Sequence, residues 1–209
     1  MKKLLLAATG VALLPLPAHA QDADEYYDDE PVVTARDGLR IEGRVLWERI
    51  NDPDEAALIN YELGSGVGFG GEIGYDVAVS DSVVVGPFVS YEASSVEECD
   101  FDLCVSSDGY LAAGLHAGFA LGPTSQVYGK LAYSQQTIDV EGIIDDPVLG
   151  AIAVNESESG GGFQIAVGYE QGFGRNMYGR IEIGSGENQD IYGFDFQRTH
   201  IGAAFGVRF

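Results

Sequence analysis

The sequence predicts an all-β protein in which eight antiparallel strands close into an up-and-down barrel that crosses a membrane. Three observations lead to this prediction. The 209 residues include 29 glycines, 11 tyrosines and 10 phenylalanines, and so much glycine disfavours helices because each interior glycine costs about 1 kcal/mol relative to alanine. Apolar and polar residues alternate with a period of two in eight segments, which is typical of strands. Short and long connections alternate between these segments.

The N-terminal 20 residues have the three parts of a secretory signal peptide. Two lysines precede an apolar run from Leu4 to Leu14, and Ala18-His19-Ala20 forms a small-x-small cleavage site. The run is too short to span a bilayer as a helix, which takes roughly 20 residues. We therefore expect residues 1–20 to be removed on export. The acidic residues 21–37 that follow are predicted to be a mobile periplasmic segment.

The barrel domain is predicted over residues 38–209. In its first segment, Leu39, Ile41, Val45 and Trp47 share one face, and charged residues occupy the other. The eight expected strands are 38–50, 66–80, 83–96, 109–121, 126–139, 161–173, 176–187 and 195–209. Short connections at 81–82, 122–125 and 174–175 alternate with long ones at 51–65, 97–108, 140–160 and 188–194. All long connections therefore belong to one rim, which we interpret as extracellular.

The apolar face is predicted to meet lipid. It carries almost no charge, whereas the opposite face carries both signs, and each segment supplies the roughly 9–11 residues that a tilted transmembrane strand needs. Aromatic residues are expected to form belts near the two strand ends, as at membrane interfaces. The outer belt is Trp47, Phe69, Tyr91, Tyr133 and Phe163, and the inner belt is Tyr75, Phe119, Phe173 and Phe209. In lipid the sheet has to close, because an open edge leaves backbone groups unpaired.

With these features the mature chain resembles the small outer-membrane β-barrels of Gram-negative bacteria, of the opacity-protein or porin-like type. The resemblance rests on the signal peptide, the alternating strands and the ending from Ile201 to Phe209. The terminal Phe209 resembles the signal that the barrel-assembly machinery reads. The resemblance implies a location in the outer membrane, contact with its lipid, and help from periplasmic chaperones and the assembly machinery. We expect a monomer.

A network of charges is predicted to fill the barrel interior, because an eight-stranded barrel is only wide enough for its own side chains or one small ligand. Five of the nine basic residues of the mature chain fall on this face, while Arg36, Arg49, Arg175 and Arg208 fall at or beyond strand ends. Contacts are expected among Arg44, Glu72, Glu42 and Arg198. The predicted lumen set is Arg40, Glu42, Arg44, Glu48, Glu72, Asp76, Glu92, His116, Lys130, Glu170, Arg180, Glu182, Arg198 and His200.

Inward-facing glycines accompany these charges. They are Gly68, Gly70, Gly74, Gly114 and Gly118. Because glycine has no side chain, they predict water-filled gaps between the charged groups.

The long connections are acidic and contain no lysine or arginine. A solvated surface explains this pattern, and weak binding of divalent cations to carboxylates is the alternative. Cys99 and Cys104 are predicted to form a disulfide in the oxidising cell envelope. A metal site with Glu97, Glu98, Asp100 and Asp102 is the alternative, but two cysteines without histidine do not complete a zinc site, so we predict no metal. The acidic residues are Asp52, Asp54, Glu55, Glu62, Glu97, Glu98, Asp100, Asp102, Asp108, Glu141, Asp145, Asp146, Glu156, Glu158 and Asp190.

The formal charge of -22 makes nucleic acid an implausible partner, because phosphates need lysine and arginine. We predict no enzyme and no cofactor. A serine nucleophile needs a histidine base, and although His116 could approach Ser134 or Ser90, a pair inside the barrel would be poorly reached by substrate. Two functions remain. One is a structural or surface-interaction barrel, and the other is a narrow porin for small hydrophilic solutes, for which the acidic connections would favour cations over anions.

Overall fold

The computed structural model describes residues 36–52, 62–146 and 150–209, which all belong to one compact unit. The predicted signal peptide and almost all of the acidic segment 21–37 lie outside the described residues. Within the described ranges the regular elements are all β-strands. No helix in this part of the chain is long and apolar enough to cross a membrane.

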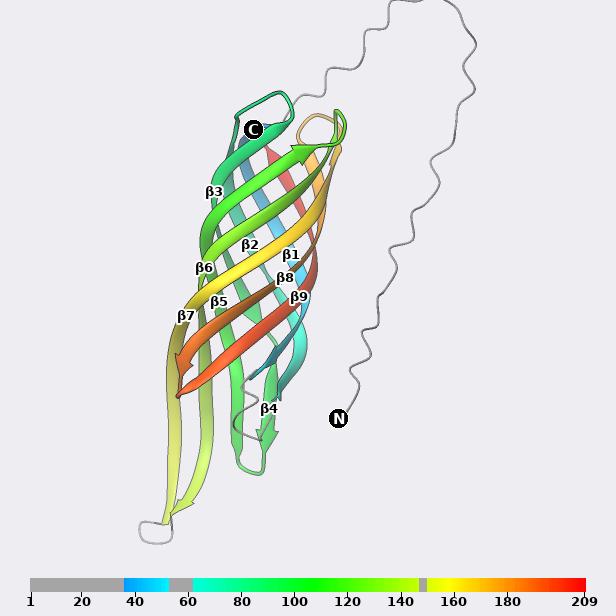
Figure 1. Ribbon diagram of the computed structural model, residues 1–209. Coiled ribbons are helices and arrows are strands. Elements are labelled where there is room, and N and C mark those ends of the chain that lie inside the picture. Colours follow the sequence, from blue (N-terminus) through cyan, green and yellow to red (C-terminus); the bar gives the residue numbers. More distant parts are fainter. Residues whose placement is uncertain (1–35, 53–61, 147–149) are drawn as a thin grey trace, which may run out of the picture. The chain divides into compact units, whose positions relative to one another are not determined.

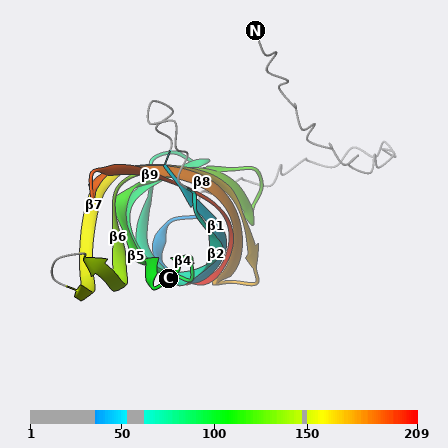
Figure 2. The ribbon, with the colours of Figure 1, turned by 90° about the horizontal axis from the view of Figure 1, so that it is seen from below.

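Eight of the strands form a closed antiparallel ring in the order β1-β2-β3-β5-β6-β7-β8-β9. Figure 1 shows the strands tilted along the wall, and Figure 2 shows the ring along its axis. The ninth strand, β4, lies outside the ring and pairs only with β5. The strands are β1 Gly38–Asn51, β2 Glu62–Ala78, β3 Val83–Ser94, β4 Glu97–Asp100, β5 Leu103–Ala120, β6 Ser125–Asp146, β7 Gly150–Phe173, β8 Met177–Ile191 and β9 Phe194–Arg208.

The ring closes where the first strand meets the last. Pairing of β1 with β9 runs from Arg40 opposite Arg208 to Asn51 opposite Gln197. Leu39 and Phe209 then exchange two backbone hydrogen bonds of 3.1 and 2.9 Å. Closure leaves no sheet edge along the wall, which a barrel in lipid requires. The predicted fold class, an antiparallel up-and-down barrel of eight strands, is confirmed.

Side chains alternate between the two faces of the wall. Along β1 exposed and buried residues follow one another strictly from Leu39 to Ile50, so Trp47 is 51% exposed while Glu48 is 1% exposed. Large apolar side chains predominate on the outward face, and the charged residues of the predicted lumen set face inward. All nine aromatic residues of the two predicted belts are on the outer surface. This inverted polarity is the one expected of a wall surrounded by lipid.

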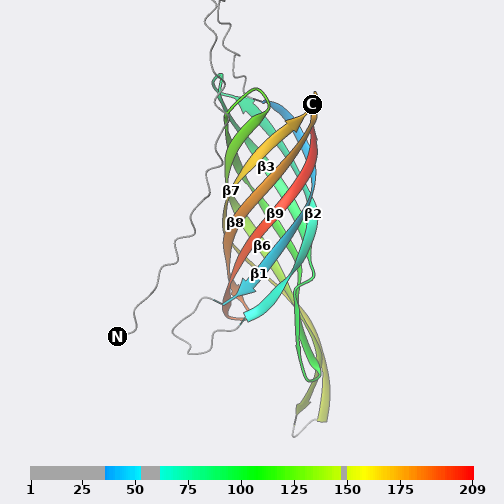
Figure 3. The same cartoon turned by 90° about the vertical axis from the view of Figure 1, so that its right-hand side faces the viewer.

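The connections at the two rims of the barrel differ in length. At one rim, short turns join β2 to β3, β5 to β6 and β7 to β8, and the chain ends there. At the other rim, the predicted connections 97–108 and 140–160 are largely strand. The β6–β7 ladder continues to Asp146 opposite Gly150 and projects beyond the ring (Figure 3).

The prediction that these segments are connections is wrong, since most of their residues belong to β4, β5, β6 and β7. Backbone pairing between neighbouring strands sustains the sheet regardless of the side-chain pattern. The predicted connection 188–194 likewise shrinks to a tight turn at Tyr192 and Gly193, both with positive φ.

The prediction of water-filled gaps at the inward glycines is wrong at the five positions named. A Cβ atom at Gly74 would lie 3.0 Å from Cζ of Arg40, one at Gly68 2.6 Å from Leu46, and one at Gly118 2.8 Å from Gln126. At Gly70 and Gly114 it would overlap the backbone of the neighbouring strand. These glycines admit close neighbours instead of leaving space.

Replacement of Gly70 by alanine should therefore destabilise the barrel. The new methyl group would overlap the carbonyl oxygen of Tyr91, and overpacking of this kind costs about 1–3 kcal/mol. Gly43→Ala is the matched control, because nothing lies within 4 Å of a Cβ at that outward position. Urea unfolding of the refolded barrels measures both free energies. Equal stability of the two variants would contradict the close packing at Gly70.

Candidate functional site

The fourteen ionisable residues of the predicted lumen set all lie inside the ring, and none is more than 8% exposed. They come from all eight strands of the wall. The alternation of each strand is sufficient to bring them to the inner face. Burial of so many charges costs free energy unless each finds partners, so their pairing determines what the interior can do.

A cluster around two glutamates occupies the middle of the lumen. Glu72 accepts hydrogen bonds from Lys130 at 2.6 Å, Arg44 at 2.9 Å and Arg40 at 3.0 Å. Glu182 binds Lys130 Nζ at 2.6 Å and also pairs with Arg44. Lys130 and Arg44 therefore each bridge carboxylates from β2 and β8, which β1 and β9 separate in the ring.

Only part of the expected contact set forms. Arg44 contacts Glu72 as predicted, but Arg198 pairs with Glu48 and, at 2.6 Å, with Glu92. Glu42 instead accepts from the Tyr178 hydroxyl at 2.9 Å and lies 3.2 Å from Arg180 Nη1. The expected contacts were inferred from which strands are neighbours in the ring. Because the strands are tilted and staggered, long side chains from distant strands meet at the same height along the axis.

A second ionic cluster lies near the short-turn rim, and its arginine was missed in the sequence. Arg208 donates to both Glu170 oxygens at 2.9 and 3.0 Å and to Asp76 at 3.0 Å. Arg36 Nη1 lies 3.6 Å from Glu170 Oε1. Arg208 belongs to the same even-numbered series as Arg198 and His200, whose side chains face inward. Its position in that series could have predicted an inward side chain, but its place near the strand end led us to leave it out of the lumen set.

Aromatic rings support the buried cations. The Arg198 guanidinium carbon lies 4.0 Å from the centroid of the Tyr110 ring, and that of Arg180 lies 4.5 Å from Tyr128. Lys130 Nζ lies 5.1 Å from the Phe88 centroid. Such cation–π contacts contribute most when desolvated. The predicted lumen set did not include these rings, because an aromatic residue on the inner face of a strand normally indicates hydrophobic packing.

The lumen becomes uncharged and then apolar toward the other rim. Ser134 donates to Asn188 at 2.8 Å, and Asn188 donates to Gln136 at 3.3 Å. Beyond this amide layer lies a cluster that we call the apolar seal, with Val105 and Tyr192 packed against it. The seal consists of Ile50, Leu63, Val96, Ile138, Ile191 and Phe196, all at most 3% exposed.

The two mature histidines take part in the ionic network. His116 Nδ1 lies 3.1 Å from Asp76, and its Nε2 lies 3.3 Å from Arg180. His200 Nε2 lies 3.3 Å from Glu182. Ser134, which the sequence placed within possible reach of His116, is bonded to Asn188 instead. Both histidines therefore have partners within the ionic network of the lumen.

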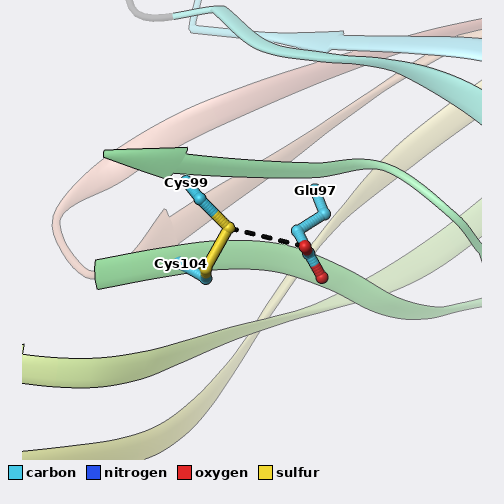
Figure 4. The surroundings of a disulfide bond; sticks show 3 residues. All are labelled: Glu97, Cys99 and Cys104. Atoms are coloured by element: carbon cyan, nitrogen blue, oxygen red, sulfur yellow. Dashed lines mark hydrogen bonds between the residues drawn. A yellow bond between two sulfur atoms is a disulfide. The ribbon is translucent and has the colours of Figure 1, made fainter. Parts of the chain in front are cut away.

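The outer rim holds the disulfide and most of the acidic residues. Cys99 and Cys104 are bonded to each other as predicted, and Glu97 Oε1 lies 3.4 Å from Cys99 Sγ (Figure 4). The bonded sulfurs carry no thiolate for a metal ion. Arg49 forms an ion pair of 2.7 Å with Glu62. Asp52 is buried, whereas Asp54 and Glu55 lie outside the described residues.

A closed eight-stranded barrel with an apolar exterior and a charged interior has the fold of the small outer-membrane β-barrel proteins. Neither a protein-family model nor a curated protein matches the sequence. Solved structures do match. Ail, the attachment invasion locus protein of Yersinia pestis, is 12% identical, with 84% of this chain and 100% of Ail covered and a TM-score of 0.53.

Two further matches support the same assignment of fold. Ail in complex with the heparin analogue sucrose octasulfate is 15% identical over 84% of this chain and 100% of Ail, with a TM-score of 0.54. Neisserial surface protein A is 11% identical over 82% of this chain and 97% of its own, with a TM-score of 0.52. At these identities the likeness concerns the fold, and at that level it confirms the resemblance that the sequence suggested.

Substitution of Glu72 by glutamine should strongly destabilise the barrel, because it leaves four buried cations with one carboxylate fewer. Loss of one partner from a buried ionic network costs about 3–5 kcal/mol. Glu62→Gln is the control, since its pair with Arg49 is about half exposed and such pairs contribute less than about 1 kcal/mol. Urea titration gives both free energies of unfolding. A loss at Glu72 as small as that at Glu62 would contradict a tightly paired interior.

Proposed function

We propose that this protein is an integral β-barrel of a bacterial outer membrane that is closed to solutes and acts as a surface-interaction protein. The outward apolar band with its two aromatic belts supports the membrane location. The export signal predicted at residues 1–20 and the resemblance of Phe209 to an assembly signal support a route through periplasmic chaperones and the barrel-assembly machinery. In this proposal the protein is monomeric and has no catalytic role.

The filled interior supports closure. Ion pairs occupy the middle of the lumen, and the amide layer and the apolar seal follow toward the outer rim. An ion that passed would have to separate buried pairs and then cross an apolar constriction, which opposes conduction by dewetting. The porin alternative requires a continuous polar path along this axis.

The surface-interaction part of the proposal is based on the projecting β6–β7 hairpin. β7 pairs with β6 from Gly150 to Gln171 but with β8 only from Gly161 onward, so no described strand covers its edge over 150–159. An uncovered edge is a template for another extended chain. Ile143 and Ile152 add exposed apolar surface near the tip, at 53% and 39% exposure.

The charge of the hairpin favours a cationic partner. Its acidic residues include Asp139, Glu141, Glu156 and Glu158, and the segment 140–160 contains no lysine or arginine. The negative field reaches the adjoining turn, where the pKa of Tyr192 is raised because partial burial disfavours the phenolate and nearby carboxylates oppose it further. Ail has been solved with a polyanionic heparin analogue, and the acidic hairpin here argues against transferring that ligand chemistry to this protein.

Planar-bilayer recording tests closure. We expect the refolded barrel to give no stable conductance steps, because the seal and the ion pairs fill the lumen. Steady steps that change in size with Glu72→Ala or Arg44→Ala would establish the narrow porin instead. Heat-modifiable migration on gels verifies in the same preparation that the recorded protein is a folded barrel.

Binding of a decalysine peptide to the barrel in nanodiscs tests the acidic hairpin. The double variant Glu141→Gln/Glu156→Gln should bind about fivefold more weakly at low salt, since two exposed pairs contribute about 0.5 kcal/mol each. Asp81→Asn is the control, because Asp81 is an exposed acid at the opposite rim. The surface-interaction proposal fails if Asp81→Asn weakens binding equally, or if heparin fragments bind better than decalysine.

A further inference from the structure

Two adjoining hollows mark the outer surface of the wall over β7, β8 and β9. One, of about 450 Å³, lies between Trp47, Ile165, Val167, Ile183 and Ile201. The other, of about 600 Å³, lies between Tyr133, Phe163, Glu187, Gln189 and Gln197. Ile165 and Ser185 line both hollows, so we treat them as one groove with two lobes.

Small outward side chains produce the groove. Ser185 pairs with Ile165 on β7 and with Thr199 on β9, so two short hydroxyl side chains stand in a band of large aliphatic ones. In the second lobe Gly161 provides the low point, and the Tyr133 ring lies over it. Tyr133 and Phe163 meet edge to face at 5.9 Å and form one wall.

Polarity changes along the groove in the direction of the membrane normal. The first lobe is lined by aliphatic residues and Trp47 toward the middle of β8 and β9. The second lobe lies nearer the outer rim, where Glu187, Gln189 and Gln197 face outward beside the aromatic walls. An amphipathic molecule of the outer leaflet has the same order, with apolar chains deeper and a polar headgroup at the surface.

The polar lobe is suited to hydroxyl groups and unsuited to phosphate. It offers a carboxylate and two amides, with Gln189 donating to Glu187 at 3.2 Å, and its lining contains no lysine or arginine. Arg49, which lies opposite Thr199, already pairs with Glu62 at 2.7 Å. A phosphate here would meet negative charge without a cation, whereas sugar hydroxyls can both donate and accept.

We propose that this groove binds a single outer-leaflet lipid with an uncharged, hydroxyl-rich headgroup, its acyl chain in the lobe at Trp47 and its sugar in the lobe at Glu187. The proposal rests on the membrane location proposed above. It assigns a binding site to the exterior of the barrel, independent of the charged lumen and of the projecting hairpin.

Trp47 is the only tryptophan in the chain, and it lines the apolar lobe, so its fluorescence reports on the occupant. The barrel is refolded into phosphatidylcholine vesicles that contain a small fraction of either galactosyl diacylglycerol or phosphatidylglycerol, each with dibrominated chains. Preferential binding should quench Trp47 more strongly with the galactolipid. Hydrogen bonds worth about 0.5–1.5 kcal/mol in total correspond to a relative association constant about 2- to 13-fold higher.

Two variants test whether the preference belongs to the groove. Ser185→Phe fills the junction of the lobes and should abolish the difference between the two lipids. Ala117→Phe makes a comparable change at an exposed position on β5, beside Val85 and Gly129 and away from the groove, and should retain the difference. Glu187→Lys should shift the preference toward phosphatidylglycerol.

The outcomes of this experiment distinguish failure of the lipid site from failure of the proposed membrane location. Equal quenching by both lipids, or stronger quenching by phosphatidylglycerol, would overturn the lipid site while leaving the barrel in the membrane. Shielding of Trp47 from every lipid, increasing with protein density, would identify a second copy as the occupant and also overturn it. Absence of quenching by any brominated lipid, together with free access of iodide to Trp47, would contradict membrane insertion itself.

Discussion

The structure depends on the requirement that no backbone hydrogen-bonding group be left unpaired along the wall. Pairing of β1 with β9 meets this requirement by closing the ring. Closure with eight strands sets a narrow interior, and strand alternation sends half of the side chains into it. Once the ring is closed, the charged residues inside depend for partners on one another and on the tyrosine hydroxyls and aromatic rings that share the lumen. The ionic network is thus a consequence of closure as much as a contributor to stability.

The interior is close to electrically neutral although the chain is strongly acidic. Within the ionic network seven buried acids face seven basic residues when Arg36 at the inner mouth is included, so the excess negative charge of the protein lies outside this network; the buried Asp52 is not counted in it. Neutrality limits the electrostatic cost of burial. The acids are Glu42, Glu48, Glu72, Asp76, Glu92, Glu170 and Glu182, and the bases are Arg36, Arg40, Arg44, Lys130, Arg180, Arg198 and Arg208.

The outer half of the molecule differs from the inner half in its interior, on its outward surface and beyond the ring. Inside, charged pairs give way to amides and then to the apolar seal. On the outer surface, the aliphatic band gives way to the polar lobe of the groove. Beyond the ring, β6 and β7 continue as an acidic hairpin. The inner rim by contrast has short turns and an arginine cluster around Glu170. This asymmetry is why the proposed functions concentrate at the outer end.

Which residues face inward and which face outward could be predicted from the sequence alone, because alternation along a strand is a local property that needs no knowledge of the neighbouring strands. The disulfide was equally local, since five positions separate Cys99 from Cys104. The tertiary structure decided the partners. Arg198 pairs with Glu48 and Glu92, and Arg208 joins Asp76 and Glu170, because tilt and stagger set the height of each side chain in the closed ring. The apolar seal, the continued hairpin and the exterior groove likewise required the register between strands, which alternation within one strand does not encode.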